Sequence, residues 1–212
     1  MINKNMLEDL VKSYDREGAW DKLEALYIAA IGLGGFTNAR LNIKIRYGSD
    51  EPVKEVERDI ERLCGERTIP SRTDDTDEEV RKILATACEQ TFPEILTRKV
   101  DESVPTLSKI TKRFVFLFYK EGNILTGGIR EKEDTVVSQY TVAYKIIFGE
   151  EMEKSEDAIV QEMIKAGLVY DCTWSSRRFW YPTLTVPPFA REVWSKLPEI
   201  IIFPTIEVNE QW

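Results

Sequence analysis

Apolar residues recur every three or four positions through most of this chain, and this spacing constrains its fold more than any other feature. Such a period places the apolar side chains on one face of an α-helix. The helix from Trp20 to Ile31 is apolar on its flanks as well, so we expect it at the centre of an N-terminal core. The same pattern predicts helices over residues 5–15, 106–121, 134–148 and 155–166, from a cap at Ser49 or Asp50 to Gly65, from a capping box at Thr76 and Glu79 to Cys88, and from Phe189 to Leu197.

A minor β component is predicted from the remaining segments. Apolar and polar residues alternate over residues 41–47, which is typical of a short, half-exposed strand. Two more strands are predicted over residues 168–174 and 178–186, joined by the turn Ser175-Ser176-Arg177. The predicted fold class is therefore mainly α with a small β component, an α+β protein.

The position of two prolines indicates how the chain is divided. Pro93 and Pro105 bracket a segment with charges of both signs, which we interpret as a linker. A boundary near residue 104 then separates a helical N-terminal region with one short strand, residues 1–104, from a C-terminal domain, residues 105–212, that ends in an apolar tail. Two small domains are an ordinary division for a chain of 212 residues.

The C-terminal domain has the element order three helices, hairpin, helix. The stretch Met163-Ile164-Lys165-Ala166-Gly167-Leu168-Val169-Tyr170 resembles the end of the third helix of a winged helix-turn-helix domain as it enters the wing. Residues 177–185 are similar to the second wing strand, and residues 189–197 to the helix that closes such a domain. The resemblance covers residues 106–197 and implies that the third helix enters a DNA major groove while the wing contacts the DNA backbone or minor groove.

The charge of the third helix departs from that expectation. Its solvent face would have a net charge of −2, which opposes the approach of phosphate groups. Winged helices also serve as protein-interaction modules, and this charge fits such a use. The residues expected on that face are Glu156, Asp157, Gln161, Glu162 and Lys165.

A basic segment lies elsewhere in the chain. The formal net charge of −8 excludes a globally cationic nucleic-acid binder, yet residues 98–132 carry +4. On the helix predicted over 106–121, four cationic residues fall within about 100° of one another, with Phe116 among them, and would form a surface that follows phosphate groups. A solvated helix face with no ligand is the plainer interpretation, and a buried strand over residues 113–119 is a further alternative. The four cationic residues are Lys109, Lys112, Arg113 and Lys120.

The tip of the predicted wing offers two more cations. Arg177 and Arg178 are flanked by Trp174 and Trp180, and arginine makes bidentate phosphate contacts and stacks on indole rings. A hairpin turn also simply needs polar residues. Both interpretations stay open.

The composition argues against an enzyme. The chain has no histidine, which excludes Ser-His-Asp and Cys-His catalysis and imidazole-bound zinc. The three cysteines form no CxxC pair, so we expect small buried residues in a reducing cytoplasm and no thiolate metal site. The acidic residues between Asp74 and Glu79 are explained by the dipole of the helix that they begin, and not by a metal. We expect neither a cofactor nor a metal. The cysteines are Cys64, Cys88 and Cys172.

These observations predict a non-enzymatic winged-helix protein that binds DNA or RNA, or acts in regulation, through the basic helix and the wing tip. The alternative is a protein–protein interaction adaptor or assembly subunit that uses the acidic third helix and the apolar tail.

Location and assembly are predicted from the composition, the longest uncharged run and the apolar C-terminal tail. The longest uncharged run, Ala25–Ala39, is shorter than the roughly 20 apolar residues that span a bilayer, so we expect no membrane contact. The odd number of cysteines favours a reducing compartment, so we expect a cytoplasmic protein. The apolar tail from Ile200 to Val208 would be an exposed β-forming edge, and we expect it to pack on its own domain, for example on the strand predicted over 41–47, or to join two copies in a homodimer. Glutamine is scarce in this chain, and this composition is typical of proteins from thermophilic organisms.

Overall fold

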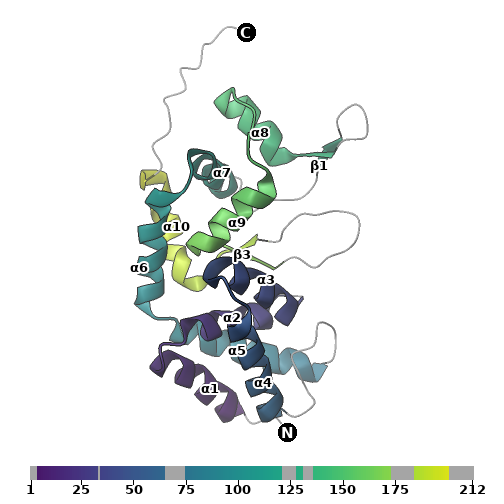
Figure 1. Cartoon of the computed structure of the whole chain (residues 1–212), viewed down its shortest axis with the longest axis vertical. Coiled ribbons are helices and arrows are strands. Elements are labelled where there is room, and N and C mark those ends of the chain that lie inside the picture. The colour runs from purple at the N-terminus through teal and green to yellow at the C-terminus, as the bar shows by residue number, and fades with distance from the viewer. Residues whose placement is uncertain are drawn as a thin grey trace.

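The computed structural model describes residues 4–32, 34–64, 75–120, 128–130, 136–172 and 184–200. Most of these residues are helical, and two short antiparallel strand pairs complete the fold, so the predicted class of mainly α with a small β component is confirmed. In Figure 1 the first helices form the lower half of the molecule and α7, α8 and α9 the upper half, with α3 and α6 between them.

The helices follow in this order: α1 (Lys4–Arg16), α2 (Trp20–Ile31), α3 (Phe36–Tyr47), α4 (Glu51–Cys64), α5 (Asp75–Thr91), α6 (Glu94–Ser103), α7 (Lys109–Lys120), α8 (Gln139–Phe148), α9 (Glu156–Ala166) and α10 (Arg191–Ile200). Two short 3₁₀ helices, η1 (Val104–Thr106) and η2 (Pro188–Ala190), precede α7 and α10. The strands are β1 (Gly128–Arg130), β2 (Val136–Ser138), β3 (Tyr170–Asp171) and β4 (Leu184–Thr185).

Helix α2 is the centre of the N-terminal region, as its sequence predicts. Every residue from Leu23 to Ala30 is buried, because α1, α3, α4 and α5 all pack around it. A helix that is apolar on nearly every side is stable only when it is surrounded in this way. The charged residue among Leu23–Ala30 is Glu24, which is fully buried and belongs to the site described below.

The strand predicted over residues 41–47 is wrong, because these residues are the second half of helix α3. The alternation is misleading because the polar residues Asn38 and Asn42 lie on the buried face of the helix, whereas the apolar Leu41 is 45% exposed. Asn38 Oδ1 accepts a hydrogen bond from the Gly34 N–H, just before the helix begins, at 2.7 Å. The Asn42 amide pairs with β3 as a strand would, accepting from the Asp171 N–H and donating to the Asp171 carbonyl, both at 2.7 Å.

The linker predicted between Pro93 and Pro105 is also wrong, because most of this segment is helix α6. Leu96 and Val100 are fully buried, and the Thr97 hydroxyl donates to the Phe189 carbonyl at 2.8 Å. The mixed charges that indicated a linker lie on the outer face of an amphipathic helix. Buried residues on both sides of residue 104 form one core, in which the two regions pack together, while the boundary at that position stays a prediction.

In the C-terminal region, α7 is followed by the β1–β2 hairpin, α8, α9, the β3–β4 pair and α10. The alternative of a buried strand over 113–119 is wrong, since these residues belong to α7. The helix predicted over 134–148 begins only at Gln139, after β2. Helix α9 begins and ends as predicted, with the Ser155 hydroxyl accepting from the Ala158 N–H and Gly167 in the left-handed conformation.

The predictions for the cysteines and for the chain end have different outcomes. Cys88 and Cys172 are buried as expected, and burial raises the pKa of the Cys172 thiol to about 11. Cys64 is half-buried.

The tail beyond Ile200 lies outside the described residues, and the strand on which it was expected to pack is helix α3.

Glu162 of α9 caps the beginning of α7, which corrects the expectation that it lies on a solvent face. Its carboxylate accepts hydrogen bonds from the Ser108 N–H, from the hydroxyls of Ser108 and Thr111, and from Lys154 Nζ. Ser108 immediately precedes α7, so the carboxylate lies at the positive end of that helix. Partial burial opposes the charged form, but these hydrogen bonds outweigh it and lower the pKa of Glu162 to about 2.

Replacing Glu162 with glutamine is expected to destabilise the protein by about 2–3 kcal/mol near pH 7. A carboxylate whose pKa falls from 4.5 to about 2 on folding contributes stability above the higher value and loses it as the pH falls towards the lower one. Glu162 is only 22% exposed, so solvent screens little of this effect. Urea unfolding near neutral pH and at about pH 2.5 measures it. A difference between variant and wild type that stays constant with pH would contradict the assignment.

Candidate functional site

The cationic residues predicted as a phosphate-following surface do not share one environment. Lys109 is exposed at the beginning of α7, and Lys112 is half-buried, with its Nζ donating to the Pro105 carbonyl at 2.8 Å. Lys120 is the last residue of α7, and its side chain lies outside the described part of the structure. Arg177 and Arg178 at the predicted wing tip also lie outside the described residues.

Arg113 is buried, which corrects its place on the exposed basic face. Its side chain is 9% exposed, and Nη1 contacts Glu150 at 2.6 Å and the Tyr144 hydroxyl at 3.3 Å. The guanidinium also lies 4.6 Å from the centre of the Phe148 ring. These contacts come from α8 and the residues after it, so the charge of Arg113 holds α8 on α7 and does not face solvent.

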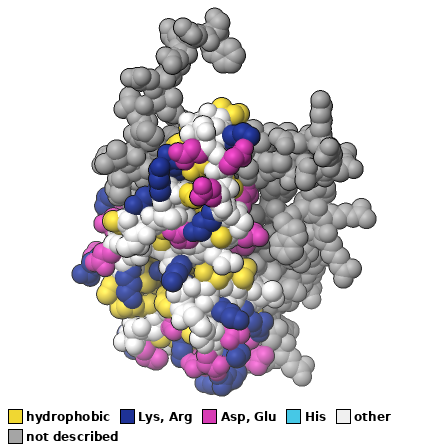
Figure 2. Space-filling model, turned by 45° about the horizontal axis from the view of Figure 1, so that its top comes forward, with side chains coloured by type: hydrophobic (Ala, Val, Ile, Leu, Met, Phe, Trp, Pro, Cys, Tyr) yellow, Lys and Arg dark blue, Asp and Glu magenta, His cyan; other side chains and the backbone are white. Residues whose placement is uncertain are grey.

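Helix α9, which the winged-helix resemblance would place in a DNA groove, is packed against α3, α6 and α7. Its free surface is a narrow strip at a spacing of four residues, where Asp157, Gln161 and Lys165 are exposed. A groove-binding helix needs a wide open face with cations. Figure 2 shows Lys and Arg side chains interspersed with Asp and Glu over the visible face of the molecule.

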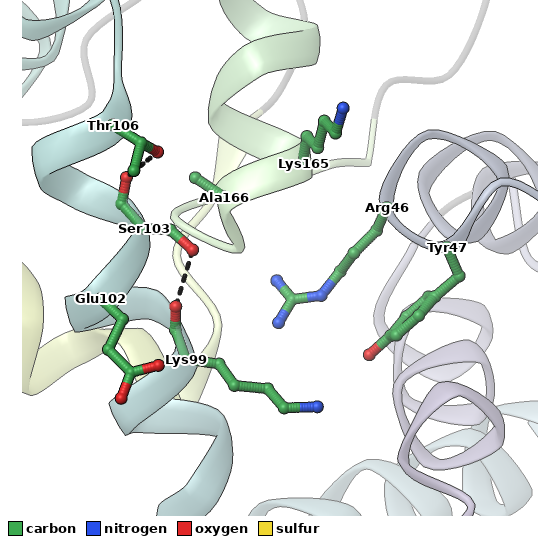
Figure 3. A pocket seen from close by; sticks show the side chains of 8 residues that line it. All are labelled: Arg46, Tyr47, Lys99, Glu102, Ser103, Thr106, Lys165 and Ala166. Atoms are coloured by element: carbon green, nitrogen blue, oxygen red, sulfur yellow. Dashed lines mark hydrogen bonds between the residues drawn. The ribbon is translucent and has the colours of Figure 1, made fainter.

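A pocket of about 330 Å³ lies where the ends of α3 and α9 meet α6 and η1. Figure 3 shows that the Arg46 guanidinium, the Lys99 side chain and the Tyr47 hydroxyl point into the space between α3 and α6. Lys165 and Glu102 lie at its edges. The pocket is lined by Arg46, Tyr47, Lys99, Glu102, Ser103, Thr106, Lys165 and Ala166.

Behind the pocket, Arg46 forms a buried ion pair with Glu24 of α2. Arg46 Nε lies 3.1 Å from Glu24 Oε2, and the two side chains are 8% and 0% exposed. The same Oε2 accepts a hydrogen bond from the Tyr47 hydroxyl at 2.8 Å. Because a buried charge is costly without a partner, this pair ties α3 to α2 at the wall of the pocket.

Arg46 also packs on the C-terminal half of the protein. Its guanidinium carbon lies 5.4 Å from the centre of the Phe189 ring, and a Cβ added to Gly167 would come within 1.7 Å of Nη1. Gly167 follows the last residue of α9, so the cation is close to the negative end of that helix. One arginine therefore connects α2, α3, the end of α9 and η2.

Burial and the ion pair shift the pKa values of this cluster. Burial raises the pKa of Glu24, although Arg46 and Tyr47 favour its charged form. Burial also opposes the charged form of Arg46, but Glu24 outweighs it, and the pKa of Arg46 lies above its usual value. The pKa values of the Tyr47 and Tyr170 hydroxyls are raised by burial and by the nearby charge of Glu24. Both tyrosines remain neutral and Arg46 remains cationic.

Three buried polar atoms in this region have no hydrogen-bond partner among the described residues: Glu24 Oε1, Arg46 Nη1 and Tyr170 OH. Unsatisfied buried polar atoms cost about 1–3 kcal/mol each, so the arrangement is not one that stability alone favours. Because Arg46 is paired with Glu24, the charged groups that the pocket can offer a ligand are the amines of Lys99 and Lys165 and the carboxylate of Glu102. In the described ranges no group of three or more Cys, Asp and Glu residues is placed to hold a metal ion.

Sequence reasoning missed this site. Arg46 falls at a polar position of the strand predicted over 41–47, Lys99 falls in the predicted linker, and Lys165 is expected on the solvent face of the third helix. The signal that could have identified α3 is the pair Asn38 and Asn42, whose spacing of four places both amides on one helix face. No sequence spacing relates Arg46 to Lys99 or Lys165.

Comparison of the chain with models of known protein families, with curated proteins and with solved structures finds no match. The geometry of the chain itself is therefore the basis for assigning a function. Each helix in the described ranges is too short or too polar to cross a lipid bilayer.

Proposed function

We propose that this chain is a non-enzymatic adaptor or assembly protein with a winged-helix-like C-terminal domain, which acts by binding another protein. The packing of α9 carries this proposal. The helix that would enter DNA is held by α3, α6 and α7, and leaves a strip of mixed charge at Asp157, Gln161 and Lys165. Such a strip suits a polar protein surface with complementary charges better than a row of phosphates.

Nucleic-acid binding is the second candidate. It is supported by the net charge of +4 over residues 98–132 and by the exposure of Lys109 at the beginning of α7. It is weakened by the burial of Arg113 and by the contact of Lys112 with the Pro105 carbonyl. In that case Lys109, together with Arg177 and Arg178 of the predicted wing, would contact the sugar–phosphate backbone. A homodimer joined by the apolar tail and a cytoplasmic location remain proposals for either function.

A charge swap on α9 tests the adaptor function. The double variant Asp157→Lys/Lys165→Glu reverses the order of charge along the strip without changing the net charge. We expect the wild-type chain to retain a partner protein during affinity purification, and the double variant to lose at least about tenfold in affinity for this co-purifying protein, since like charges then face each other. The matched control is Asp9→Lys/Lys12→Glu on α1, where both residues are also exposed.

The same two variants distinguish the two candidates. Equal binding of the co-purifying protein by the α9 swap and the α1 swap would contradict the adaptor function at this surface. Fluorescence anisotropy with labelled duplex and single-stranded DNA and RNA at rising salt forms the second arm. Binding that weakens steeply with salt would show several neutralised phosphates and would favour the nucleic-acid candidate.

A further inference from the structure

We propose that the exposed strip of α9, formed by Asp157, Gln161 and Lys165, binds the same strip of a second copy of this chain. The proposal rests on the proposed function, because it names the partner of the surface that the charge swap on α9 tests. It depends on the order of the charges along the strip, and on the lack of ion-pair partners for its two charged residues within the described part of the chain.

The geometry of the strip suits a second helix. Its three residues are four positions apart, so their side chains lie on one face of α9 and span about 12 Å along the helix axis. All three are exposed, although α3, α6 and α7 pack against other parts of the helix. Ala158 lies beside the strip, and its small side chain allows another helix to approach closely.

The charges along the strip follow the order negative, neutral, positive, which is self-complementary. A two-fold axis at Gln161 makes the second α9 antiparallel to the first, and places Asp157 of each copy opposite Lys165 of the other. The two Gln161 amides then meet at the axis, where each can donate a hydrogen bond to the carbonyl oxygen of the other. The strip therefore supplies two ion pairs and a reciprocal amide contact to a symmetric dimer.

The dipole of α9 explains only part of this arrangement. It favours an acidic residue in the first turn and a basic residue in the last turn, as α9 has. It makes no demand on where these residues lie around the helix axis. The alignment of Asp157 and Lys165 with Gln161 on the exposed face is what a symmetric partner requires.

The charged groups of the strip are available to a partner. Neither Asp157 nor Lys165 forms an ion pair with another described residue, whereas Lys154 and Glu162 beside them are already paired with each other. Figure 3 shows the Lys165 amine directed away from the Arg46 guanidinium, towards the outside of the pocket. A second copy supplies the opposite charge to both ends of the strip.

Sedimentation velocity at low salt and increasing protein concentration tests the proposal with single charge reversals. Asp157→Lys places a lysine opposite Lys165 of the second copy, and Lys165→Glu places a glutamate opposite its Asp157. Because the two-fold axis repeats each repulsion, we expect either variant to weaken dimerisation at least about tenfold. The matched controls on α1, Asp9→Lys and Lys12→Glu, alter the net charge equally at exposed positions and should dimerise as the wild type does.

Two combinations should restore the dimer. The double variant Asp157→Lys/Lys165→Glu reverses both charges, so opposite charges face each other again and it should dimerise with itself as the wild type does. An equimolar mixture of the two single variants should form a heterodimer for the same reason. A substitution that only disturbs the folding of α9 would produce neither restoration.

The proposal is overturned if the wild-type chain stays monomeric, if the single variants dimerise as the α1 controls do, or if the mixture of single variants stays monomeric. Dimerisation that the reversals leave unchanged would assign the interface to another surface. The adaptor function has a separate outcome. If the double variant loses a different co-purifying protein while the single variants self-associate as the wild type does, the adaptor function is supported and this dimer is refuted.

Discussion

Replacing Arg46 with methionine is expected to destabilise the protein by about 3–5 kcal/mol, because the change leaves Glu24 buried and without its ion-pair partner. Glu24 is fully buried, and its other described contact is the Tyr47 hydroxyl. Methionine matches the arginine side chain as far as Nε and removes the guanidinium, so the loss measures the charge together with the contact between the guanidinium and Phe189. Urea unfolding followed by circular dichroism provides the measurement.

The double variant Glu24→Gln/Arg46→Met is the control for this prediction. Glutamine still accepts the hydrogen bond from Tyr47 but carries no charge, so the pair should be markedly more stable than Arg46→Met alone. The pH dependence gives a second check. An unpaired buried carboxylate has a raised pKa, so its cost disappears at low pH, when it is protonated, and grows as the pH rises through that pKa. A double variant as unstable as the single one, together with a cost independent of pH, would refute the role of the pair.

Replacing Gly167 with alanine is expected to cost about 3 kcal/mol or more, for two physical reasons. Gly167 has φ +80°, where an L residue is strained by about 1–2 kcal/mol. In addition, the new Cβ would lie 1.7 Å from Arg46 Nη1, so the guanidinium must move away and its contacts with Glu24 and Phe189 are disturbed. The expected loss therefore approaches that of breaking the ion pair itself.

Gly48 offers a matched control for this substitution. It follows the end of α3 with φ +84°, and a Cβ there would meet nothing within 4 Å. Gly48→Ala should therefore cost only the backbone strain of about 1–2 kcal/mol. The difference between the two variants, measured by the same unfolding experiment, isolates the contact with Arg46. Equal costs would mean that Arg46 adjusts without losing its partners.

The winged-helix hypothesis and the structure agree on some elements and differ on others. The order of α9, the β3–β4 pair and α10 matches the order that residues 155–197 predicted. Because the turn between the two strands lies outside the described residues, the wing itself remains part of the proposal. The structure differs from the hypothesis in the role of α9. This helix packs on α3 and on the beginning of α7, through contacts such as that of Glu162 with Ser108, and is not free to enter a groove.

Local interactions explain what the sequence by itself determined. The position of α9 follows from the Ser155 cap, the stripe of apolar residues and Gly167, all of which act within a few residues of one another. The central place of α2 follows from its apolar surface. Both features are properties of a single segment, so they can be predicted without knowing what the segment packs against.

Only the tertiary structure decided the rest, because it depends on partners far away in the chain. Lys109 and Arg113 lie on nearby faces of α7, yet one is exposed and the other is buried, since α8 covers only Arg113. Asn42 can lie on the buried face of α3 because its amide finds hydrogen-bond partners in β3, which begins more than a hundred residues later. Arg46 and Lys99 enter one space only when α3 and α6 pack together, and a charged pocket built from several helices leaves no periodic pattern in the sequence.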